Sequence, residues 1–183
     1  MIASQKAIIE QIKQRARSNF SSGFNCAECV TEAAWAIIDT GLGSDAWKLA
    51  TGFGGGMGLY GDTCGALAGA LLAVAAIHGR SALPKGVDRR DALAKSREQL
   101  YNKPGLYRVF NQLPNWFVAQ HGHTQCREIT AAWQSEWLCR EHALHCREII
   151  TQTAGKAAEL MLLSRTDCLS LEFGDIVEEA GRG

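Results

Sequence analysis

The sequence predicts an all-α fold, a compact multi-helix domain around one central buried helix, with a glycine-rich loop beside that helix. Three observations favour this class. Apolar residues recur at helical spacing along most of the chain, and no segment keeps the two-residue alternation of a strand. Only three of the 183 residues are proline. The run at residues 66–77 is apolar nearly all round, as is typical of a helix that is buried on every side.

The individual elements follow from caps, breaks and apolar periodicity. Asn25 is expected to cap the second helix, and Asp62 or Thr63 the central one. Pro114 is expected to kink or break the helix that contains it. We expect helices at residues 3–19, 26–40, 45–50, 64–78, 87–101, 106–121 and 143–163, with a connection rich in cysteine and histidine over 122–145.

Residues 1–163 are expected to form a single helical domain, and residues 164–183 an acidic C-terminal tail.

The 19 basic and 19 acidic side chains cancel, so there is no electrostatic reason to expect nucleic acid or a membrane surface as a partner. The first 20 residues carry five charges and no continuous apolar core, unlike a secretory signal. The longest apolar run is too short to span a bilayer. We therefore expect a cytoplasmic protein. Helices that are apolar on more than one face permit a homodimer.

The chain contains seven cysteines, and their number and placement require an explanation. In a reducing compartment they do not indicate a disulfide framework, which leaves metal ligation, redox chemistry or simple burial. Four of them are expected near helix starts on inward, apolar faces, where the helix dipole favours the thiolate. Four thiolates from separate segments suit a tetrahedral sulfur site or an iron–sulfur cluster. The alternative is that buried cysteines act as small apolar side chains. The four are Cys26, Cys64, Cys126 and Cys146.

Residues 52–69 contain eight glycines and lead into the first turn of the central helix. Gly56, Gly58 and Gly61 match G-x-G-x-x-G, but no strand precedes them and no acidic residue ends a second strand, so we reject a dinucleotide site. No Gly-Lys-Ser/Thr follows, which excludes a Walker loop. What remains is a nest of backbone N–H groups that can bind anions, including the sulfides of a cluster. The expected cofactor-binding glycines are Gly54, Gly55, Gly56, Gly58 and Gly65.

Two weaker patterns add alternatives. Cys26 and Cys29 form a C-x-x-C pair that can act as a redox dithiol, although the strand that precedes it in thioredoxins is missing. His142 and Cys146 lie one helical turn apart and can clip zinc, although such histidines are more often surface or capping residues. Trp133 and Trp137 are most simply a stripe of core side chains. No C-x-x-C-H occurs, so covalent haem is not supported.

The ordered set of motifs resembles the family of redox-active proteins named for its C-GCAxxG-C-C pattern. Asn25-Cys26-Ala27 comes first, then Cys64-Gly65-Ala66-Leu67-Ala68-Gly69, then Cys126 and Cys146. A related domain occurs in split-Soret cytochromes, which are dimeric and carry an iron–sulfur centre. The resemblance implies that the four cysteines hold a cluster, with [2Fe–2S] favoured. Cys29, Cys139 and Cys168 are additional to the family pattern.

Three functions are therefore open. The first is a redox-active protein that binds an iron–sulfur cluster through the four cysteines and serves electron transfer or redox sensing with a separate redox partner. The second is a metal-free thiol–disulfide oxidoreductase or thiol sensor, with Cys64 or Cys26 as the attacking thiolate. The third is a structural zinc or heavy-metal-binding module. Catalytic turnover is not implied by any of these patterns.

Overall fold

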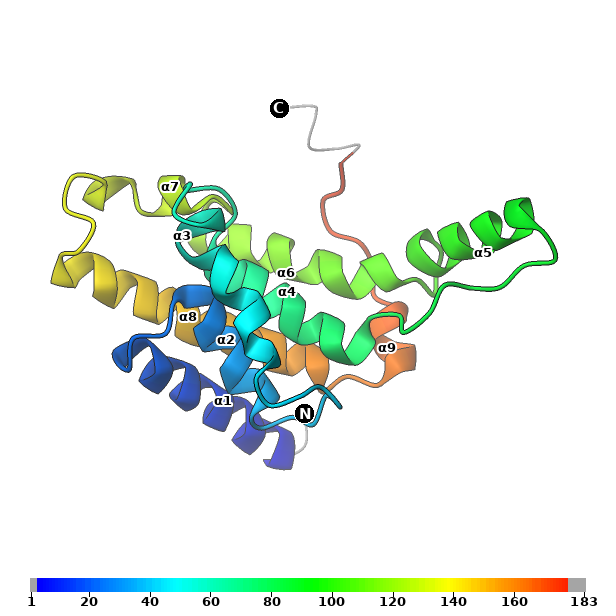
Figure 1. Cartoon of the computed structure of the whole chain (residues 1–183), viewed down its shortest axis with the longest axis horizontal. Coiled ribbons are helices and arrows are strands. Elements are labelled where there is room, and N and C mark those ends of the chain that lie inside the picture. The colour runs from blue at the N-terminus through cyan, green and yellow to red at the C-terminus, as the bar shows by residue number, and fades with distance from the viewer. Residues whose placement is uncertain (1–2, 178–183) are drawn as a thin grey trace.

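The computed structural model describes residues 3–177 and is built from helices, which confirms the predicted all-α class (Figure 1). Within that range no segment forms a β-strand. The α-helices in chain order are α1 (Ala3–Ser21), α2 (Cys26–Trp35), α3 (Gly54–Met57), α4 (Gly65–His78), α5 (Arg89–Tyr101), α6 (Leu106–His121), α7 (Cys126–Ile129), α8 (Arg140–Met161) and α9 (Arg165–Leu169). Two 3-10 helices, η1 (Ala46–Phe53) and η2 (Ala131–Trp133), complete the set.

Helix α4 is the central element, as its composition predicts. It packs against α2, α6 and α8, and its alanine- and glycine-rich sequence allows the neighbouring backbones to come close (Figure 1). At Gly69 an added Cβ would lie 2.5 Å from the carbonyl oxygen and 3.0 Å from the Cα of Ala27 in α2. The contact between α2 and α4 therefore depends on the absence of a side chain at this position.

Helix α1 closes the domain by packing on α2 and α8. Ile12 and Ala16 are fully buried on its inner face. On its outer edge, Arg15 forms a bidentate ion pair with Glu32 of α2, in which its Nε donates to Oε2 at 2.9 Å. The Nδ2 of Asn19 donates to the same carboxylate at 2.5 Å. These bonds tie α1 to the second half of α2, the helix that begins with the first predicted cysteine.

Several predicted boundaries are wrong. The second helix was expected to reach residue 40 but ends at Trp35, and the chain continues in turns. The expected side-chain cap of α4 by Asp62 or Thr63 is absent, because Cys64 itself occupies the N-cap position without a side-chain capping bond. Helix α6 runs unbroken through Pro114. We attribute its continuity to the burial of Val109, Leu113 and Phe117 on both sides of the proline, which outweighs the lost backbone bond.

The connection predicted over residues 122–145 is partly helical, since it holds α7, η2 and the first turn of α8. Helix α8 begins at Arg140, three residues before the predicted start, because Cys139 caps it by accepting the N–H of His142 at 3.4 Å. Cys146 consequently lies almost two turns inside the helix rather than at its start. Cys26 and Cys126, in contrast, are the first residues of α2 and α7, as predicted.

Two regions, α5 and the segment after residue 163, lie at the periphery of the domain. Helix α5 extends away from the helical body and has no buried residue (Figure 1). After residue 163, α9 packs on α6 and buries Cys168 in the core. The end of the predicted tail, residues 178–183, lies outside the described residues. Throughout residues 3–177, every helix is too short or too polar to cross a membrane.

Candidate functional site

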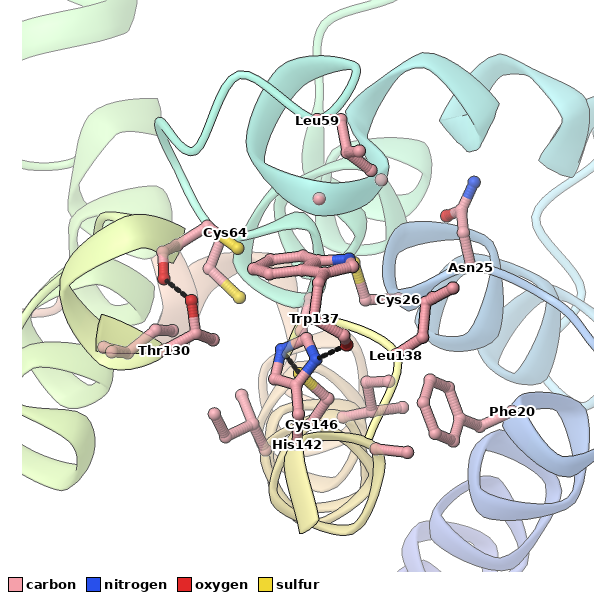
Figure 2. A pocket seen from close by; sticks show the side chains of 18 of the residues that line it. Phe20, Asn25, Cys26, Leu59, Cys64, Thr130, Trp137, Leu138, His142 and Cys146 are labelled. Atoms are coloured by element: carbon pink, nitrogen blue, oxygen red, sulfur yellow. Dashed lines mark hydrogen bonds between the residues drawn. The ribbon is translucent and has the colours of Figure 1, made fainter. Parts of the chain in front are cut away.

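All four predicted cysteines line one pocket of about 530 Å³ (Figure 2). They come from separate segments: the start of α2, the N-cap of α4, the start of α7 and the second turn of α8. All four are free thiols. The other lining residues are mainly apolar: Phe20, Asn25, Thr51, Gly54, Gly55, Gly58, Leu59, Ala66, Ile129, Thr130, Trp137, Leu138, His142, Ala143, Ile149 and Ile150.

Cys64 and Cys126 are brought together by a short antiparallel pairing of two loops. Thr63 and Gln125 form an isolated β-bridge. On either side of it, the Cys64 amide donates to the carbonyl of Thr124 at 2.8 Å, and the Cys126 amide donates to that of Asp62 at 2.7 Å. Because side chains alternate across an extended backbone, both cysteines lie on the face opposite to that of the bridged pair. Each thiol residue is only 5% exposed.

Cys26 is placed by the cap of α2. Asn25 Oδ1 accepts the N–H groups of Ala27 and Glu28, both at 3.0 Å, and the Glu28 carboxylate accepts the Asn25 amide at 2.9 Å. This reciprocal capping box fixes the entry of the chain into the helix. Behind Cys26, a Cβ at Gly65 would collide with its Sγ and would lie 2.7 Å from the carbonyl oxygen of Phe53. Gly65 therefore lets α4 start directly against this thiol.

The Asn25 cap yields a stability prediction. Asn25→Ala removes two acceptor bonds and also the bond from Nδ2 to the carbonyl of Thr51 at 3.0 Å. We expect the free energy of unfolding to fall by about 1–2 kcal/mol, as measured by urea denaturation. Asn25→Asp keeps the acceptor and should retain most of the stability. Equal stability of the alanine variant and the unaltered protein would contradict the capping role.

The glycine-rich loop forms a left-handed turn over the pocket. The φ angles of Gly55, Gly56 and Gly58 are 62°, 73° and 65°. Two non-glycine residues of the same turn, Met57 and Leu59, also have positive φ angles, of 61° and 71°. Non-glycine residues rarely adopt such angles, since each costs about 1–2 kcal/mol. Strain of this kind is often found at functional sites.

The five predicted glycines have two different roles. Gly54, Gly55 and Gly58 line the pocket itself, whereas Gly56 and Gly65 pack behind its wall. At Gly56 a Cβ would lie 2.6 Å from the carbonyl oxygen of Asp62 and 2.8 Å from the Cβ of Cys126. The loop is thus folded tightly against the segment that carries Cys126.

The pKa values of the four thiols are shifted in the direction opposite to the prediction. Helix starts were expected to lower their pKa values, but burial has the larger effect. Burial raises the pKa of Cys126 to about 11 and that of Cys146 to about 12, and it raises the pKa of Cys64 as well. Burial also raises the pKa of Cys26, although hydrogen bonds from the backbone N–H groups of Gly55 and Ala27 oppose it. The predicted lowering of thiol pKa values is therefore wrong, because a mostly apolar pocket disfavours the charged form.

Three features of the site lie outside the predicted set of four cysteines and five glycines: Trp137, the apolar wall, and His142, which the sequence offered only as part of a zinc clip with Cys146. His142 Nε2 lies 3.2 Å from the Sγ of Cys146, and the centroid of its ring lies 4.2 Å from that of Trp137. The predicted core stripe of Trp133 and Trp137 is wrong, since both are only partly buried and pack on histidine rings. The one-turn spacing of His142 and Cys146 was the available signal.

The three additional cysteines lie outside the pocket lining. Cys29 is fully buried in the core, with its Sγ 3.5 Å from the carbonyl of Phe24, so the two thiols of the C-x-x-C pair face different surroundings. Cys139 caps α8. Cys168 lies 3.4 Å from the Nδ1 of His78 at the far end of α4.

The donor chemistry of the pocket suits a soft metal or an iron–sulfur cluster, since four sulfur atoms from four segments face one cavity. In the arrangement described, no three histidine, cysteine, aspartate or glutamate side chains within residues 3–177 lie together closely enough to hold a metal ion.

Fold and pocket together define a class of protein: an all-α domain that gathers four free cysteines from distant segments around one cavity. The chain belongs to the family described as "Putative redox-active protein (C_GCAxxG_C_C)", whose model matches residues 24–160. The matched range begins just before Cys26 and ends within α8, so it contains the four cysteines and the glycine loop. No curated protein and no solved structure matches the chain.

Proposed function

We propose that this protein is a redox protein that binds an iron–sulfur cluster, of the [2Fe–2S] type, and serves electron transfer or redox sensing. The proposed ligands are Cys26, Cys64, Cys126 and Cys146. One observation carries the proposal: these four free thiols, far apart in the sequence, line a single pocket. Cysteine thiolates are the usual ligands of such clusters.

Each part of the pocket has a role in this proposal. An iron–sulfur cluster supplies reversible one-electron transfer when bound. The backbone N–H groups of Gly55 and Ala27 counteract the effect of burial on the pKa of Cys26 and so favour negative charge on its sulfur. The side chains of Phe20, Leu59 and Ile149 make the walls apolar and limit the access of water.

The raised pKa values of Cys126 and Cys146 disfavour thiol–disulfide exchange at these two residues. A thiol with a pKa of about 11 or 12, as at Cys126 and Cys146, is almost wholly protonated near neutral pH and is a weak nucleophile. A bound metal, in contrast, displaces the thiol proton directly. The same burial that lowers the reactivity of the thiols therefore protects a cluster once its ligands are deprotonated.

A second candidate function is supported by the bridge between residues 63 and 125. It sets Cys64 and Cys126 on the same face of two paired loops, as expected of a dithiol that reduces a disulfide substrate. In that reaction one thiolate attacks the substrate and the other resolves the mixed disulfide. The substrate leaves as two thiols, and the protein keeps a Cys64–Cys126 disulfide.

Anaerobic purification followed by metal analysis tests the proposal. We expect a coloured protein with iron and inorganic sulfide in equal amounts, and with loss of the colour when an iron chelator is added under denaturing conditions. A colourless protein without iron, in which all seven thiols titrate, would overturn the cluster proposal. A Cys64–Cys126 disulfide that forms on oxidation of that protein would favour the dithiol function. One zinc ion per chain would instead indicate a structural metal module.

A further inference from the structure

His142 presents an unshared nitrogen lone pair to the pocket. Its Nδ1 lies 2.6 Å from the carbonyl oxygen of Trp137. A carbonyl oxygen can only accept, so Nδ1 donates its proton to it, and in the neutral imidazole Nε2 is then an acceptor. Nε2 lies 3.2 Å from the Sγ of Cys146, and the residue as a whole is 6% exposed (Figure 2).

The orientation of this imidazole is held from several directions. The ring of Trp137 packs 4.2 Å away and that of Trp133 5.9 Å away, measured between centroids. The backbone amide of His142 is bonded to the Cys139 sulfur at 3.4 Å. His142 and Cys146 also lie one turn apart on α8, so their side chains share one face of the helix. The pair is therefore preorganised before any ligand arrives.

The Nε2 of His142 and the Sγ of Cys146 are almost at the separation that two ligands of one metal ion require. A tetrahedral metal with bonds of about 2.3 Å to sulfur and about 2.0 Å to nitrogen sets these two donors about 3.5 Å apart. A metal-bound histidine usually donates its other ring N–H to a carbonyl or carboxylate, as His142 does to Trp137. In the neutral pair the Cys146 thiol can donate its proton to Nε2, and a metal ion would take the place of that proton.

We propose that His142 is a nitrogen ligand of the metal centre and binds the same metal atom as Cys146. The centre then has a mixed sulfur and nitrogen ligand set rather than four thiolates, and one of the four cysteines is not a permanent ligand. This inference rests on the proposed function, in that it assumes a metal or cluster in this pocket. It adds a donor that the four-cysteine pattern does not contain.

His145 offers a matched control on the same helix. Its Nε2 lies 3.1 Å from the carbonyl of Ile129, and it does not line the pocket. His142→Gln and His145→Gln therefore remove comparable side chains, one inside the pocket and one outside it. Circular dichroism of each variant reports whether the fold is kept.

Two measurements test the ligand directly. In pulsed electron paramagnetic resonance of the reduced, iron-loaded protein, we expect a strong coupling to a histidine nitrogen, kept in His145→Gln and lost in His142→Gln. In anaerobic titration of the metal-free chain with Co²⁺, we expect His142→Gln to weaken binding about tenfold or more. It should also move the visible absorption bands, whereas His145→Gln should do neither.

The failures of the two proposals can be told apart. Absence of iron from the unaltered protein overturns the iron–sulfur proposal, and the Co²⁺ titration then still decides whether His142 is a ligand. An iron-loaded unaltered protein without nitrogen coupling overturns the His142 inference alone. This last measurement needs no variant, so it remains decisive even if His142→Gln fails to fold.

Discussion

Gly69→Ala is expected to lower the free energy of unfolding by about 3 kcal/mol, the upper range for an overpacked core position. The new methyl group would lie 2.5 Å from the carbonyl oxygen and 3.0 Å from the Cα of Ala27. Both are backbone atoms of α2, so no side chain can turn away to make room. The two helices must separate, which also moves Cys26 relative to the pocket. Urea denaturation measures the change in stability.

Gly155→Ala in α8 is the matched control. There the added Cβ would meet the Cδ of Lys13 at 3.0 Å, and a flexible side chain can move aside. Because alanine is the better helix former, we expect this variant to be unchanged or to gain up to about 1 kcal/mol. Equal destabilisation by both substitutions would contradict the proposed close contact between α2 and α4.

Cys64→Ser is expected to reduce the iron content of the anaerobically purified protein about tenfold or more. Cys64 caps α4 and faces the pocket beside Cys126, so its loss removes a donor at the point where two loops meet. Serine keeps the size of the side chain and is a good N-cap residue, so the fold should be preserved. Cys126→Ser should have the same effect. Iron and sulfide analysis with the visible spectrum measures the loss.

Cys168→Ser is the control for that experiment. Cys168 is fully buried, more so than the site cysteines, but it contacts His78 at the other end of α4 and does not line the pocket. Its replacement should leave the iron content and the spectrum unchanged. If Cys64→Ser and Cys126→Ser retain full iron while Cys168→Ser loses it, the pocket is not the cluster site.

Much of the helical framework could be predicted because the relevant signals are local. The apolar run at residues 66–77 indicated a buried helix, and α4 is central. Asn25 was recognised as a cap from its residue type and position, and it forms a complete capping box. The break that Pro114 could cause does not occur, since the local penalty of a proline is outweighed by packing that the sequence does not display. The start of α8 was missed because a cysteine is an unusual N-cap.

The sequence by itself determined the all-α class, the central helix and the set of four cysteines with the glycine loop, because periodicity, caps and ordered motifs can be read within a few turns of chain. Only the tertiary structure decided that these thiols share one pocket and that Gly65 and Gly69 are contact points for α2. It also reversed the expected shift of the thiol pKa values. The physical reason is the same in each case: distance and burial depend on segments that meet across 40 to 120 residues of chain, and no local pattern encodes them.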